Sequence, residues 1–148
     1  MAITQAVANS FKTEVLTATH NFTATTGNTF KIALYTNSAT LSKSTTAYTT
    51  SNEVSGTGYT AAGNTLTSVT PTLSSDTAVC DFADTSWTSA TFTTHGCLIY
   101  NTTAVTGFTT NRAVCVVYFG GAKTVSNGTF SIEFPTASTS AAILRITS

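Results

Sequence analysis

Charged side chains are scarce in this sequence of 148 residues. Lysine and arginine total six, aspartate and glutamate total six, and the formal net charge is zero. Charged residues make up 8% of the chain, whereas about 25% is usual for a soluble domain. Because neutralising phosphates requires an excess of basic side chains, this balance argues against direct binding of nucleic acid. The 41% of apolar residues also argues against intrinsic disorder.

Long apolar runs and the usual catalytic motifs are missing as well. No stretch approaches the roughly 18 apolar residues of a membrane helix. The first ten residues lack the basic start and apolar core of a signal peptide, so we expect neither a membrane partner nor export. There is no CxxC, HExxH, GxSxG or Walker motif. The sequence therefore predicts no enzyme, with no catalytic residue, no metal site and no cofactor.

Three cysteines are present, spaced 17 and 18 residues apart. Cys80, Cys97 and Cys115 each lie in an apolar run. This setting favours buried structural thiols over the alternatives of a disulfide or a metal site.

The histidines and the acidic cluster also have plain structural interpretations. His20 falls at the end of a predicted helix, where a cation is mildly stabilising, and His95 precedes a glycine in a turn-like segment. Asp76, Asp81 and Asp84 form the only local concentration of charge. They straddle a predicted strand and do not match a calcium-binding loop, so turn or cap roles are expected.

The first twenty residues differ from the rest of the chain. They contain neither glycine nor proline, and Ile3, Val7, Phe11 and Val15 recur at a spacing of four. The spacing predicts an amphipathic helix over residues 4–19, so residues 1–20 form a helical arm before a single β-domain over residues 21–148. The apolar stripe has two interpretations, since it either packs on its own domain or docks on a neighbouring subunit.

Short runs of β-branched and aromatic residues, separated by turn signals, follow this arm. They predict about eight strands and an antiparallel β-sandwich or barrel-like domain. The predicted strands cover residues 29–36, 64–70, 78–82, 88–93, 97–100, 113–119, 129–134 and 142–147. Thr and Ser contribute 36 and 16 residues, and threonine suits a solvated sheet surface. Residues 37–55 are polar and predict a long loop that is exposed or clasps a partner.

Trp87 is the only tryptophan. It packs in the core or on a sheet face, or it anchors an interface. The five tyrosines, together with Trp87, could line a sugar-binding surface, but their scatter along the chain favours packing between sheet faces.

Several segments, taken in order, resemble a family of small, threonine-rich structural proteins of tailed bacteriophages. They are FTATTGNTFKIALYT (22–36), NEVSGTGYT (52–60), DFAD (81–84) with Trp87, LIYN (98–101) and NRAV (111–114). The resemblance covers nearly the whole chain. It implies a component of the phage particle, assembled in the cytoplasm of the bacterial host, and it supplies no catalytic residues.

The hypothesis that follows is a capsid decoration, or cement, protein on the outer capsid surface. Such a protein would bridge major capsid subunits and form a symmetric homo-oligomer such as a trimer, with Ile3, Val7, Phe11, Val15 and Trp87 as candidate interface residues. Contacts without ion pairs would vary little with ionic strength. The alternatives are a tail, baseplate or fibre-base component and, less favoured, a carbohydrate-binding module for host adsorption.

Overall fold

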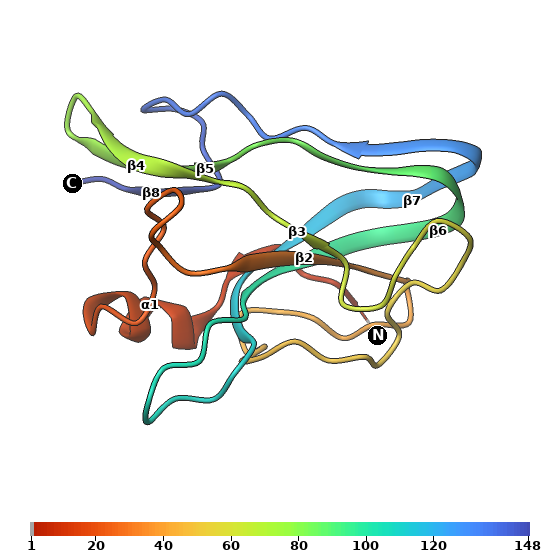
Figure 1. Ribbon diagram of the computed structural model, residues 1–148, viewed down its shortest axis with the longest axis horizontal. Helices are drawn as coiled ribbons and strands as arrows, with labels where there is room; N and C mark the ends of the chain where they lie inside the picture. Colours follow the sequence, from red (N-terminus) through yellow and green to blue (C-terminus); the bar gives the residue numbers. More distant parts are fainter. Residues whose placement is uncertain (1) are drawn as a thin grey trace.

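The computed structural model describes residues 2–148, so Met1, at the start of the predicted arm, lies outside the described residues. The chain forms one antiparallel sheet with the order β1-β7-β6-β2-β3 and a second with the order β4-β5-β8 (Figure 1). These two layers and one short helix confirm the prediction of an all-β sandwich. The elements are β1 (Ala6–Val7), α1 (Asn9–Leu16), β2 (Phe30–Tyr35), β3 (Asn64–Thr65), β4 (Ser68–Ser74), β5 (Thr77–Phe82), β6 (Thr85–Asn101), β7 (Arg112–Ile132) and β8 (Leu144–Ile146). Among the described residues, no helix is long and apolar enough to cross a bilayer.

A single long hairpin, β6–β7, contributes to both layers. Its open end continues from β5 in the upper layer of Figure 1, and the hairpin then curls over and returns through the lower layer. We call residues 96–101 with 112–118 the inner half, and residues 85–94 with 123–132 the outer half. The prediction of four separate strands at 88–93, 97–100, 113–119 and 129–134 is wrong, because these segments form two continuous strands.

The bend between the two halves explains the error. One residue separates Thr94 from Gly96 in β6. Four residues separate their pairing partners in β7, Lys123 and Tyr118. The extra residues include Gly120 and Gly121, which have positive φ angles of 75° and 144°. The glycines that resembled turn residues therefore form an irregularity inside one strand, and this irregularity bends the hairpin.

The N-terminal arm begins as extended chain rather than as a helix. Ala6 pairs with Val116 at the edge of the five-stranded sheet, and Ile3 forms an isolated bridge with Leu41. The helix covers only Asn9–Leu16, so the predicted helix over residues 4–19 is too long. A spacing of four residues returns a side chain to the same face in a strand as well as in a helix, and the pattern of Ile3 and Val7 therefore fitted both.

Residues 37–63 are called here the covering loop. Its first part lies on the side of the five-stranded sheet that faces away from the three-stranded sheet (Figure 1), and residues 56–58 lie against Ala90 and Thr91 of the outer half. Ala39, Leu41 and Val54 in this loop are buried. The Tyr48 ring stacks on Tyr100 of β6 with ring centroids 4.8 Å apart. The expectation of an exposed loop over residues 37–55 is therefore wrong for these side chains, because the loop forms a third layer over the inner half.

Candidate docking groove

The candidate interface residues lie in two environments. Ile3, Phe11 and Trp87 are buried, with 7%, 6% and 3% of their surface exposed. Val7 and Val15 are only partly buried and pack at the edge of the core. An interface role for the five residues stays a prediction, and Val7 and Val15 are the members that remain accessible.

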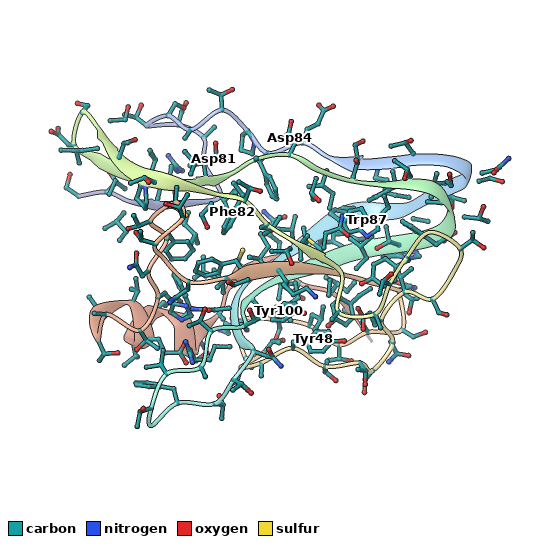
Figure 2. The ribbon with its side chains drawn as sticks, in the orientation of Figure 1. Tyr48, Asp81, Phe82, Asp84, Trp87 and Tyr100 are labelled. Carbon is teal, nitrogen blue, oxygen red and sulfur yellow. The ribbon has the colours of Figure 1, made fainter. Side chains whose placement is uncertain are left out.

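Trp87 lies between the two layers (Figure 2). Its ring packs near Tyr59, Phe92 and Phe130, with centroid distances of 6.1, 6.5 and 5.9 Å. Its indole N–H is buried and has no hydrogen-bond partner among the described residues. Because a sugar-binding platform needs an exposed ring face, this position argues against using Trp87 to adsorb glycans.

An open, mainly apolar groove of about 710 Å³ separates α1 from the three-stranded sheet. We call it the docking groove. Its helical wall carries Phe11, Lys12, Val15 and Leu16, and its floor includes Val7 and Phe22. The opposite wall comes from Pro71 of β4, residues 78–80 of β5 and residues 142–147 around β8. The sequence identified the helical wall, whereas the sheet wall is a new finding.

A second cavity, of about 510 Å³, adjoins the docking groove. Both are lined by Ala142 and Ile143. The second cavity is lined by Cys97 and Ile99 of the inner half and by Phe130 of the outer half, among others. The sandwich is therefore open along the side where β1 and β8 are the edge strands.

A buried polar cluster anchors the helical wall of the groove. We call Glu14, His20, Asn101 and Arg112 the anchor cluster. Glu14 Oε2 lies 2.7 Å from His20 Nε2 and 3.8 Å from Arg112 Nε. The Arg112 side chain is fully buried and donates to the carbonyls of Thr109, Thr103 and Thr19. The cluster ties α1 to the closed end of the β6–β7 hairpin.

The hydrogen bonds of His20 define its protonation state. The Asn101 side-chain nitrogen lies 3.0 Å from His20 Nδ1 and also donates to Asn28, while the Asn101 side-chain oxygen accepts from the amide of Thr103. Because an amide nitrogen only donates, Nδ1 accepts, and the ring is neutral with its proton on Nε2, where Glu14 accepts it. Burial lowers the pKa of His20 and outweighs the opposing effect of Glu14. The predicted helix-end cation is therefore a neutral, buried histidine beyond the helix.

A second polar cluster holds the covering loop. The Glu53 carboxylate accepts hydrogen bonds from the hydroxyls of Tyr48 and Tyr59, at 2.7 and 2.6 Å, and from the amide of Ala62 at 2.7 Å. Burial and the bond to Glu53 raise the pKa of Tyr48 to about 12. The Tyr59 hydroxyl also accepts from the amide of Leu34. These groups satisfy one another, and the cluster fixes the loop on the sheet.

The three cysteines are free and buried, which confirms the prediction of structural thiols. Burial raises the pKa of Cys80 and of Cys115 to about 12, so both stay protonated and are poor nucleophiles and metal ligands near neutral pH. Within residues 2–148, no three His, Cys, Asp or Glu side chains come together to form a metal site.

Two of the three aspartates have structural partners. Asp81 accepts a hydrogen bond from the amide of Phe82, and Asp84 accepts one from the amide of Phe134. Both aspartates lie along the upper layer, with Phe82 directed between the layers (Figure 2). His95, predicted in a turn, lies within β6 at the bend.

Comparisons with protein-family models, with curated proteins and with solved structures found no match for this chain. The docking groove is mainly apolar and open, and the two polar clusters hold the fold together. This chemistry suits binding by shape and apolar contact.

Proposed function

We propose that this chain is a structural protein of a tailed bacteriophage particle, and that it decorates the outer surface of the capsid. The docking groove is the observation that best supports a structural role, because it leaves apolar side chains of both layers accessible at one end of the molecule. Contiguous accessible apolar surface is a common mark of a protein–protein contact. The resemblance of residues 22–114 to phage structural proteins is the reason for proposing that the assembly is a phage particle.

The charge balance supports a position on the outside of the shell. Six basic and six acidic side chains give a net charge of zero, and an inner position against packaged DNA would favour a basic surface. Contacts that depend on apolar area rather than on ion pairs also change little with ionic strength. A neutral subunit that bridges capsid subunits through such contacts stabilises the shell over a wide range of salt concentrations.

The number of copies in each particle tests the proposal. Quantitative mass spectrometry of purified particles, calibrated against the major capsid protein, should find hundreds of copies, as expected for a tile repeated over the shell. A few dozen copies or fewer would overturn decoration and favour the tail, baseplate or fibre-base alternative. Absence of the chain from the particles would overturn a structural role altogether.

A loss-of-function experiment tests the cementing role separately. Particles assembled without this protein should release their DNA at lower temperature or lower osmotic stress than complete particles, and adding the purified protein back should restore their resistance. Particles of unchanged stability in both assays would contradict cementing, even if the protein is abundant in the shell.

A further inference from the structure

The three-stranded sheet extends past the five-stranded sheet and lies over α1 at the left end of Figure 1. Its register places Leu73 of β4 opposite Ala78 of β5, and Ala78 opposite Ile146 of β8. Residues paired in this way project from the same face of a sheet. Leu73 and Ile146, at the two ends of this row, are 74% and 67% exposed.

The helical wall presents a third exposed apolar side chain at the same end. Leu16, the last residue of α1, is 86% exposed and lines the docking groove together with Ile146. Six large apolar side chains are exposed in the described part of the chain, and Leu16, Leu73 and Ile146 are three of them. Single exposed leucines are ordinary, but Leu16 and Ile146 together line one groove, and Leu73 is exposed on the neighbouring hairpin, so this end of the molecule carries the marks of a contact surface.

The charges at the groove are all basic. Lys12 and Arg145 line it and are exposed. Lys12 donates to Asn9 and Arg145 to the carbonyl of Thr139, and neither forms an ion pair within residues 2–148. Glu14 on the same helix turns toward His20, and its side chain is only 12% exposed. An occupant that matches this groove therefore combines an apolar side chain with an acidic one.

The β4–β5 hairpin carries that combination. Its tip, residues 73–76, carries the exposed Leu73 and the exposed Asp76. Asp76 forms no ion pair with any described residue. The tip protrudes at the same end of the molecule as α1 (Figure 1). The chain thus carries both an apolar groove with basic charges and a complementary apolar and acidic tip.

We propose that the docking groove receives the β4–β5 hairpin tip of a second copy of this chain. Leu73 of the incoming tip packs against Leu16 and Ile146, and the carboxylate of Asp76 lies near Lys12 and Arg145. The contact forms either a two-fold dimer, in which each copy inserts its tip into the groove of the other, or a small closed ring. The inference rests on the proposed function of the groove as a docking site and names its occupant.

Light scattering on the purified full-length chain over a range of concentrations tests this contact. The wild type should form a dimer or a small ring. Arg145→Glu and Asp76→Lys should each weaken self-association by about tenfold or more, because each places like charges opposite one another. The double variant, which exchanges the two charges, should recover most of the loss.

A matched control, a second test variant and a check of the fold make the outcome decisive. Lys43→Glu makes the same change in charge at an exposed lysine of the covering loop and should leave self-association unchanged. Leu73→Ser removes the apolar part of the contact and should also weaken it. Because all the substituted side chains are exposed, circular dichroism and the melting temperature should stay at their wild-type values.

The proposal is overturned if the wild type stays monomeric at the highest accessible concentration. It is also overturned if Arg145→Glu behaves like Lys43→Glu, or if the double variant does not recover, because another surface or an unrelated partner would then be responsible. The proposed function has a separate outcome. A monomeric chain that is abundant in particles contradicts only the self-contact, whereas a self-associating chain that is absent from particles contradicts only the role in the particle.

Discussion

The inner and outer halves of the β6–β7 hairpin belong to the same two strands but are buried differently. From Gly96 to Asn101 and from Arg112 to Val116, every residue is buried. In the outer half, buried residues such as Trp87 and Phe92 are separated by exposed ones. The inner half lies between the upper layer and the covering loop, whereas the outer half is covered on one face only.

This difference in burial shows that the two halves have different structural roles. A strand that is covered on both faces has a continuous apolar sequence, and a strand covered on one face alternates. The inner half, with the anchor cluster at its closed end, fixes the position of α1 and thereby one wall of the docking groove. The outer half closes the other layer and leaves a threonine-rich face to solvent. Substitutions matched between the two halves should therefore differ strongly in their effect.

Removing the buried cation should have the largest effect. Arg112→Met leaves the Glu14 carboxylate without its cation and three backbone carbonyls without a donor, so the free energy of unfolding should fall by about 3–5 kcal/mol. Lys123→Met removes an exposed cation from the outer half of the same strand and should change stability by less than about 0.5 kcal/mol. Urea unfolding of both variants measures the difference. Similar losses would show that the two halves are not distinguished by burial.

Deleting the same methyl groups from each half should give the next largest contrast. Val116→Ala opens a cavity where only 1% of the side chain is exposed, and it should cost about 2 kcal/mol. Val125→Ala, at a partly buried position of the outer half, should cost less than about 1 kcal/mol. The measurement is the denaturant midpoint at a constant m-value. A larger loss at Val125 would contradict the proposed layering.

The glycines provide a third matched pair. A Cβ on Gly96 would lie 2.6 Å from the Val117 carbonyl oxygen and 2.9 Å from Ile3 Cγ2, so Gly96→Ala should cost about 1–2 kcal/mol. A Cβ on Gly128 in the outer half would meet nothing closer than 3.5 Å, and Gly128→Ala should be nearly neutral. Thermal unfolding of the two variants checks this. Equal melting temperatures would mean that Ile3 does not pack on the bend.

The smallest expected effect is a dependence of stability on pH. Because the pKa of His20 is lowered in the folded state, the unfolded chain binds the proton more readily. The stabilising contribution is complete above the unfolded pKa of about 6.5 and is lost as the pH falls below it. His20→Gln should reduce the loss of stability between pH 7.5 and pH 5. An unchanged loss of stability in His20→Gln would contradict the assignment to His20.

The fold class could be predicted from the sequence because alternation and turn signals are local. The segment 29–36 contains β2, and 78–82 lies within β5. The continuity of β6 and β7 could not be predicted, because Gly96, Gly120 and Gly121 have the same local signature in a turn and in a bend. The third layer, formed by the covering loop, could not be predicted from the sequence either. The covering loop is polar in sequence, and tertiary contacts rather than periodicity bury Leu41 and Val54.

The docking groove was predicted only in part. The spacing of Phe11 and Val15 indicated the helical wall, because both residues lie on one face of α1. The sheet wall depends on the pairing of β8 with the β4–β5 hairpin, from which β8 is far away in sequence, and no local pattern relates Leu73 to Ile146. The anchor cluster was missed for the same reason, since His20 and Asn101 are 81 residues apart and meet only in the folded chain.

A cryo-electron microscopy map of the phage particle, with this chain located in it, tests the central claim most directly. We expect the chain to lie on the outer capsid surface, with the end formed by α1 and the three-stranded sheet in contact with a neighbouring subunit. A chain located in the tail, or one bound to the shell with this end facing solvent, would rule out decoration through the docking groove.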